Sequence, residues 1–435
     1  MTNIRVGVPG VVTLVLGTAV CWAGPAVPNE LTARGGLPNF FGKLQRGEEA
    51  RIAYVGGSIT DAEGWRPMTH QWFQENYPEA TITAHNAAHS GTTSDLACFR
   101  LKRDCLPFEP DLLFIEFGVN DGIATRERIY RGIEGIIRQA RRANPEMDIC
   151  LVYTLCESMV KGIQEGKFPH TYEAMEVIAG HYNVPSLHMG LEVVRKEREG
   201  AILFRGKYPT TDAEKAELGD RILFSCDGVH PLKEGHAFYR DAVARAMEAM
   251  ASMGEPGPVP LPKPFREDSF EDARPTSLER VSLSSGWRKL DPATHPLANR
   301  FQAKLPELWY ADVPGESITV RFKGTSILLY DVVGPDCGQV IVIIDGKERK
   351  TIPRFDAWCQ DYRVYYLIAA TDLEDAEHVA RFVIHPEQPD RAAILKQRGK
   401  TIDDPGRYDG TTWYVGDVLV TGEVLPADCV QHDVH

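Results

Sequence analysis

Between about Arg51 and Met253 the chain alternates short apolar runs with longer helical stretches, and this alternation restricts its fold more than any other feature. The apolar runs predict strands at 52–55, 81–85, 112–117, 149–155 and 184–187. Helical spacing of apolar residues predicts helices at 67–77, 94–102, 126–143, 171–182 and 233–250. Such alternation implies right-handed crossovers, so we predict an α/β domain with a parallel sheet covered by helices on both faces.

The composition changes abruptly after this region. Five prolines fall within residues 254–264, a pattern that is typical of a stiff, extended linker. The chain beyond it is rich in predicted strands, at 317–322, 326–332, 340–344, 363–369, 378–384 and 413–421. Asp345-Gly346 lies between the apolar run 340–344 and the charged run 347–350 and predicts a hairpin. We therefore predict a β-sandwich accessory domain at 265–435, joined by the linker 254–264 to a domain at 27–253.

The N-terminus has the features of a secretory signal peptide. A largely apolar run at 6–23 is followed by small residues at 23–26 that suit cleavage. An uncleaved membrane anchor is the alternative, but Pro9 and the small residues favour cleavage. We therefore expect residues 1–26 to be removed and the protein to be secreted or periplasmic.

Charge and cysteine content narrow the classes of partner. The chain has 48 Lys and Arg against 61 Asp and Glu, and this net charge of −13 argues against nucleic acid or an anionic membrane surface. A small or neutral ligand fits better, and no stable membrane partner is expected.

Cys98 and Cys105 have a spacing that permits a disulfide, although free buried thiols are the more ordinary interpretation. No cysteines have CxxC spacing, so we expect no structural zinc, and no cofactor is predicted.

Two segments carry groups suited to ester hydrolysis. Ser58 follows Gly56-Gly57 at the carboxyl end of the first predicted strand, which is where open α/β sheets carry their functional residues. Asp227 and His230 stand three residues apart ahead of the last helix of the domain. His230 can accept the proton of a serine hydroxyl, and Asp227 can hold the imidazole in the required tautomer. Each segment alone is weak evidence, since such motifs are often turns or helix caps.

Together with two further segments, 86–94 and 118–121, these motifs resemble the SGNH (GDSL-like) hydrolase superfamily. The resemblance covers about residues 50–250 and implies a flavodoxin-like parallel sheet flanked by helices, with Ser58 as nucleophile in a triad with Asp227 and His230. It also implies an oxyanion hole formed by the backbone N–H groups of Ser58 and Gly91 and the side-chain amide of Asn120. The chain departs from the pattern at Gly57, where many members have Asp, and at 89–90, where a glycine is common.

Several other polar residues receive a structural interpretation. Asp61 and Glu63 could shape the mouth of the site but are expected to be solvated loop carboxylates, and Asp121 is expected to hold its loop by hydrogen bonds. His236 is predicted to lie on a helix surface. Aromatic residues of the second domain could stack on sugar rings, although most are expected to fill the sandwich core. The turn at 407–413 is a candidate binding loop.

These features favour an exported serine esterase acting on an acylated carbohydrate, most simply an O-acetyl ester. The association of the two domains suggests this substrate but does not determine it. One alternative is a carbohydrate-binding protein whose hydrolase domain is idle, which the joint presence of all the motif residues disfavours. A lysophospholipase or thioesterase on the same fold would differ only in substrate, and no amphipathic insertion suggests a lipase lid.

Overall fold

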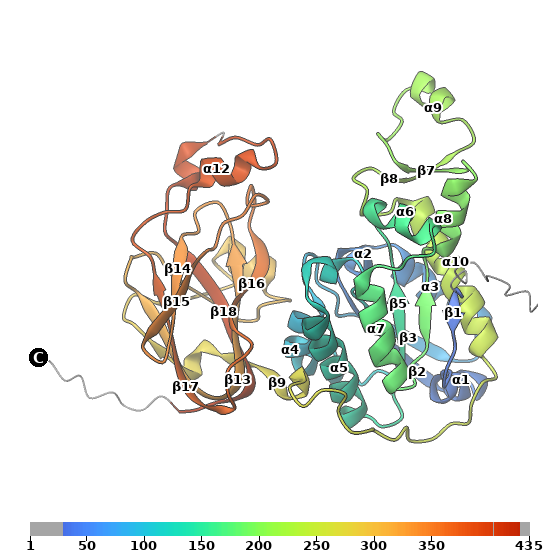
Figure 1. Ribbon diagram of the computed structural model, residues 1–435, viewed down its shortest axis with the longest axis horizontal. Coiled ribbons are helices and arrows are strands. Elements are labelled where there is room, and N and C mark those ends of the chain that lie inside the picture. The colour runs from blue at the N-terminus through green and yellow to red at the C-terminus, as the bar shows by residue number, and fades with distance from the viewer. Residues whose placement is uncertain (1–28, 403, 427–435) are drawn as a thin grey trace, which may run out of the picture.

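The computed structural model describes residues 29–402 and 404–426, so the predicted signal peptide lies outside the described residues. The chain forms an α/β domain followed by a β-rich domain that lies beside it (Figure 1). The described segment 251–269 contains no helix or strand, between the end of one domain's last helix and the start of the next domain. On this basis we propose the limits 27–253, 254–264 and 265–435 for the two domains and their linker.

The first domain is built on a six-stranded sheet in the order β1-β6-β5-β4-β2-β3. Its strands are β1 (Leu31–Thr32), β2 (Glu49–Gly56), β3 (Thr81–Asn86), β4 (Leu112–Glu116), β5 (Asp148–Tyr153) and β6 (Ser186–His188). The five strands β2 to β6 are parallel, in the flavodoxin-like order, and β1 adds an antiparallel edge. The predicted α/β fold is therefore confirmed.

Helices flank this sheet and include all five that the sequence predicts. They are α1 (Pro38–Gln45), α2 (Ser58–Asp61), α3 (Trp65–Asn76), α4 (Ser94–Asp104), η1 (Leu106–Phe108), η2 (Asn120–Ile123), α5 (Arg126–Ala143), α6 (Glu157–Gln164), α7 (His170–His181), α8 (Leu191–Arg198) and α10 (Lys233–Met250). Helices α4, α5 and α7 pack side by side, and α3, α10 and α8 form a second group. A small excursion, β7 (Ile202–Arg205), α9 (Asp212–Leu218) and β8 (Ile222–Ser225), projects from the domain (Figure 1).

The second domain is an antiparallel, ten-stranded structure. Its elements are η3 (Phe270–Asp272), β9 (Ala273–Ser277), η4 (Leu278–Arg280), β10 (Ser282–Leu283), β11 (Arg288–Leu290), α11 (Pro296–Phe301), β12 (Leu308–Ala311), β13 (Ser317–Val333), β14 (Gln339–Ile344), β15 (Lys347–Pro353), β16 (Arg363–Ala370), β17 (Ala376–Ile384), α12 (Arg391–Lys396), η5 (Pro405–Tyr408) and β18 (Trp413–Val424). The two strands predicted at 317–332 are one long strand, β13. The predicted hairpin is confirmed, because Asp345 and Gly346 have positive φ angles between β14 and β15.

Side chains of β13 alternate between two hydrophobic cores. Ile327 and Leu329 point into the core of the β domain, whereas Leu328, Tyr330 and Val332 belong to the large core that continues into the α/β domain. Successive side chains of a strand point to opposite faces, so a strand that is covered on both faces carries apolar side chains at consecutive positions. The domains therefore share an apolar interface.

The disulfide considered between Cys98 and Cys105 is not present, because both thiols are free and buried. The two residues are seven positions apart along α4 and its C-terminal end. Seven residues of α-helix span about 10 Å, which exceeds the Cα separation that a disulfide can bridge. The Cys98 thiol instead donates to the carbonyl of Phe270 at 3.2 Å, so it takes part in the contact between the domains.

Candidate active site

The predicted site residues come from loops at the carboxyl ends of the parallel strands. Ser58 begins α2, directly after β2, and Gly91 lies in the loop that follows β3. Asn120 begins η2 after β4, while Asp227 and His230 lie between β8 and α10. The carboxyl ends of parallel strands are where open α/β sheets bind their ligands, so β2, β3 and β4 bring Ser58, Gly91 and Asn120 to one edge of the sheet. The loop after β8, which lies in a separate two-stranded sheet, brings His230 to Ser58.

Ser58, His230 and Asp227 form a connected hydrogen-bonded series. His230 Nε2 lies 2.8 Å from Ser58 Oγ, and His230 Nδ1 lies 2.7 Å from Asp227 Oδ2. With the proton on Nδ1, the ring donates to the carboxylate and presents an acceptor to the serine hydroxyl. The side chains of His230 and Asp227 are about half exposed, at 51% and 55%, so a substrate can approach this series from solvent.

Asp227 is oriented by its own loop. Its Oδ1 accepts hydrogen bonds from the backbone N–H groups of Val229 and His230, each at 2.9 Å, and from Ser225 Oγ at 3.0 Å. Partial burial acts to raise the pKa of Asp227, but the hydrogen bonds from His230 and Val229 outweigh it and lower the pKa well below its usual value. The carboxylate is therefore ionised near neutral pH, as a partner for an imidazole requires.

Gly57 leaves the space that the Asn120 side chain occupies. A Cβ added at Gly57 would lie 2.0 Å from Asn120 Oδ1 and 2.5 Å from Nδ2. The amide of Asn120 therefore lies against the backbone immediately before Ser58. In this structure a residue with a Cβ at position 57 would therefore collide with the Asn120 side chain.

Gly91 has a φ of +73°, in the left-handed region that favours glycine. Its loop is tied back to the sheet, because the N–H of His89 donates to the carbonyl of Gly56 at 3.0 Å. A Cβ added at Gly91 would lie 3.9 Å from a guanidinium nitrogen of Arg363. A residue of the β domain therefore lies beside the predicted oxyanion donor.

Glu116 is a buried group of the site that the sequence interpretation missed. Its carboxylate accepts from Thr60 Oγ1 at 2.9 Å and from Thr154 Oγ1 at 2.6 Å, and so connects the helix that begins at Ser58 to β4 and to the residue that follows β5. Burial raises the pKa of Glu116. A single carboxylate within the otherwise apolar run 112–117 was the available signal.

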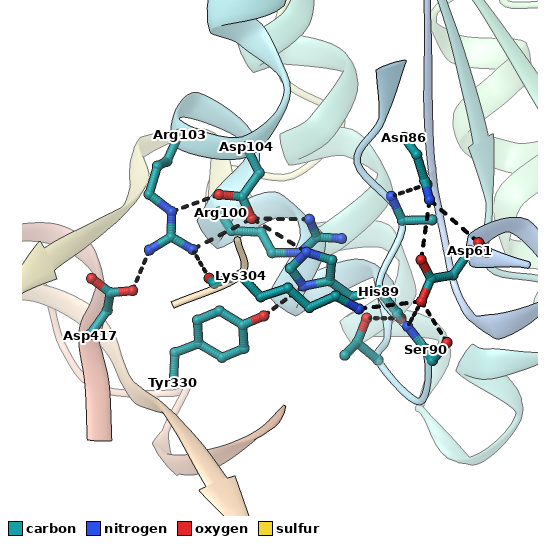
Figure 2. A network of polar contacts seen from close by, with 12 residues as sticks. Asp61, Asn86, His89, Ser90, Arg100, Arg103, Asp104, Lys304, Tyr330 and Asp417 are labelled. Carbon is teal, nitrogen blue, oxygen red and sulfur yellow. Dashed lines mark hydrogen bonds and ion pairs between the residues drawn. The ribbon is translucent and has the colours of Figure 1, made fainter. Parts of the chain in front are cut away.

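Two expectations for nearby residues were wrong. His236 is buried at 5% exposure rather than on a helix surface, and its Nδ1 accepts from the N–H of Trp65 at 3.2 Å. Asp61 is not a solvated loop carboxylate, because it binds Ser90, Asn86 and, from the β domain, Lys304 (Figure 2). Asp121 does hold its loop, accepting from the N–H of Ser94 at 3.0 Å.

The aromatic residues of the β domain divide between packing and exposure. Trp287 and Trp413 lie in its core, and Tyr366 and Tyr414 belong to the core shared with the first domain. Trp358 is exposed at 59%, with the guanidinium of Arg398 over its ring. Most of these rings therefore contribute to packing, as the sequence interpretation favoured, and Trp358 remains open to solvent.

Comparison with known proteins agrees with this architecture. Residues 54–238 match the model of the GDSL-like Lipase/Acylhydrolase family. A similar solved structure is a two-domain esterase active on acetylated mannans, co-crystallised with mannopentaose. It is 21% identical, with a TM-score of 0.68, and the match covers 92% of this chain and 98% of that one. A second structure, also of a two-domain esterase active on acetylated mannans, gives 20% identity, a TM-score of 0.69 and coverage of 91% and 98%.

At this level of identity, the likeness to the two structures concerns the fold, and it extends over both domains. No curated protein matches the chain. The family assignment rests on the stretch that contains Ser58, Gly91, Asn120, Asp227 and His230. Residues 54–238 of the α/β domain are thus similar to the GDSL-like lipase/acylhydrolase family, and the comparisons support a carboxylic ester hydrolase.

Proposed function

We propose that the protein is an exported serine esterase that removes acyl groups, in the first place acetyl groups, from a carbohydrate. The observation that carries the proposal is the series Ser58–His230–Asp227, with hydrogen bonds of 2.8 and 2.7 Å that are open to solvent. A serine hydroxyl with a base in hydrogen-bond reach, and a carboxylate behind the base, is the arrangement that nucleophilic acyl transfer needs.

In the proposed reaction, Ser58 Oγ attacks the ester carbonyl carbon while His230 Nε2 takes its proton. The N–H groups of Ser58 and Gly91 and the amide of Asn120 donate to the oxyanion that develops. The intermediate collapses with cleavage of the bond to the sugar oxygen, which receives the proton from His230. Water then attacks the acyl-enzyme, assisted by His230, and releases acetate and free Ser58.

Acetylated carbohydrate is proposed as the substrate because the similar two-domain esterases act on acetylated mannans and share both domains of this fold. The exposed Trp358 offers a face for a sugar ring. None of the described helices has the length and apolar character to cross a bilayer. Export is proposed from the signal-peptide features of residues 1–26.

The test is release of acetate from acetylated mannan, acetylated xylan and an aryl acetate, by wild type and Ser58→Ala. We expect wild type to release acetate and the variant to lose at least a thousandfold in kcat. A phosphonate ester with an aryl leaving group should transfer its phosphonyl group to Ser58 of wild type, releasing the phenol, and should leave Ser58→Ala unchanged; intact-protein mass spectrometry measures the added phosphonyl group. Preference for a lysophospholipid or an acyl thioester over the acetylated substrates would replace the carbohydrate assignment. Binding to polysaccharide without turnover of any ester would support the idle-domain alternative.

A further inference from the structure

The loop that carries Gly91 lies between the two domains. Figure 2 shows this loop, with His89 and Ser90, directed toward Lys304 and Tyr330 of the β domain. Tyr330 is 241 residues from its partner His89 in this loop, and Lys304 is 243 residues from Asp61, which in turn binds Ser90 of the loop. The β domain therefore reaches the α/β domain where the predicted oxyanion hole lies, and it does so through polar side chains as well as the apolar interface.

The first connection runs from Lys304 through Asp61 to Ser90. Lys304 Nζ donates to Asp61 Oδ2 at 3.3 Å, and the same oxygen accepts from Ser90 N at 3.1 Å and from Ser90 Oγ at 2.6 Å. Burial acts to raise the pKa of Asp61, but the hydrogen bonds from Ser90 and the charge of Lys304 lower it. Asp61 is the last residue of the helix that begins at Ser58, so it joins this helix to the Gly91 loop.

The second connection is between His89 and Tyr330. His89 Nδ1 lies 2.6 Å from the Tyr330 hydroxyl, and the two rings are stacked with centroids 6.2 Å apart. His89 is only 6% exposed, and burial, together with nearby Arg and Lys charges, keeps its pKa well below the usual value. A neutral imidazole can accept the phenolic proton, so this contact fixes the residue that precedes Ser90.

A third contact lies on the other side of Gly91, where Thr93 Oγ1 is 2.5 Å from the Tyr366 hydroxyl. The loop is therefore attached to the β domain both before and after the glycine. This matters because a glycine has more accessible backbone conformations than any other residue, and its N–H direction depends on how its neighbours are held. An oxyanion donor stabilises the transition state only when its direction is fixed beforehand.

We propose that Lys304 and Tyr330 are positioning residues that hold the Gly91 N–H in the oxyanion hole, so that the β domain is part of the catalytic apparatus. The inference rests on the proposed esterase function. Lys304 acts through Asp61 and Ser90, and Tyr330 acts through His89. Neither residue needs to contact the substrate for this role.

The experiment compares the full-length variants Lys304→Met, Lys304→Arg and Arg142→Met on an aryl acetate, which lacks the sugar. Arg142 is the matched control. It lies at the C-terminal end of α5, and its ion pairs with Glu271 and Asp272 also connect the two domains, but they do not involve the Gly91 loop. We expect Lys304→Met to lower kcat about tenfold with KM changed less than twofold, a fraction of the loss from removing an oxyanion donor. Lys304→Arg should restore most of kcat, and Arg142→Met should match wild type.

Non-additivity separates positioning through Asp61 from a general effect on stability. We expect Lys304→Met combined with Asp61→Asn to be no slower than Asp61→Asn alone, because both changes interrupt one connection. Wild-type kcat in Lys304→Met would overturn the inference. An equal loss in Arg142→Met, or a loss confined to KM on acetylated polysaccharide, would do the same.

Hydrogen exchange of the loop amides gives a readout that does not depend on turnover. Lys304→Met should speed exchange at 89–91 at least fivefold, and Arg142→Met should leave it unchanged. If wild type hydrolyses no ester, the proposed function fails while faster exchange still supports the cross-domain attachment. If wild type is active and exchange in Lys304→Met is unchanged, the positioning role alone is overturned.

Discussion

At the scale of single residues, the most informative position is Gly57. Glycine is not required here by a positive φ angle, because Gly57 has a φ of −91°. Glycine is required here because the Asn120 amide occupies the volume into which a Cβ would project. In this structure the placement of the Asn120 amide thus depends on the absence of a side chain at position 57.

Gly57→Ala should therefore displace Asn120 and lower activity. A Cβ 2.0 Å from Asn120 Oδ1 forces the amide to move, and loss of one oxyanion donor costs on the order of a hundredfold in kcat. Steady-state kinetics on an aryl acetate measure the effect. Gly122→Ala is the control, since an added Cβ there meets no atom within 4 Å. Unchanged kcat in Gly57→Ala would show that Asn120 does not act as a donor.

At the scale of elements, long periodic segments were predictable and short ones were not. Helices α5 and α10 lie at the predicted residues, because their apolar positions follow the helical period over 18 residues each. The helices α6 and α8 and the excursion β7–α9–β8 were not predicted, since segments of four to eight residues contain too few positions to define a period. The hydrogen-bonded series was anticipated from motifs, whereas Glu116, Asp61 and His236 act through partners that only the fold supplies.

His236 gives α10 a pH-dependent contribution to stability. Burial lowers its folded pKa to about 4, from an ordinary value of 6.5. Between these values the unfolded chain binds the proton and the folded chain does not, so stability falls as the pH is lowered through this window. We expect His236→Asn, which keeps an acceptor for the N–H of Trp65 but does not titrate, to remove about 1 to 2 kcal/mol of the loss between pH 7 and pH 5.

Urea unfolding of wild type and His236→Asn at a series of pH values measures this difference. Buried Asp121 and Asp148, whose pKa values are raised to about 7, titrate in the opposite sense, but they are present in both proteins and cancel in the comparison. Parallel pH profiles for the two proteins would contradict the assignment of this titration to His236.

At the scale of the whole molecule, the shared core determines how the domains behave. Phe270 of η3 is buried and packs on Phe99 of α4, with ring centroids 5.3 Å apart, and its carbonyl accepts from Cys98 and Gln139. Sequence patterns predicted both domains but not this contact, because the partners are more than 130 residues apart and belong to segments that look independently folded. An interface that is apolar and continuous with the core opposes independent domain motion.

We therefore expect the two domains to unfold in one cooperative transition by differential scanning calorimetry. Phe270→Ala removes a buried ring from the interface and should destabilise the protein by about 3 kcal/mol, lowering the temperature of that single transition by several degrees. Phe265→Ala is the matched control, because Phe265, which directly follows the linker, is 41% exposed, and the change should shift the transition by much less. Two separate transitions in wild type, or a shift in Phe270→Ala that affects one domain alone, would show that the α/β and β domains are stabilised independently despite their common core.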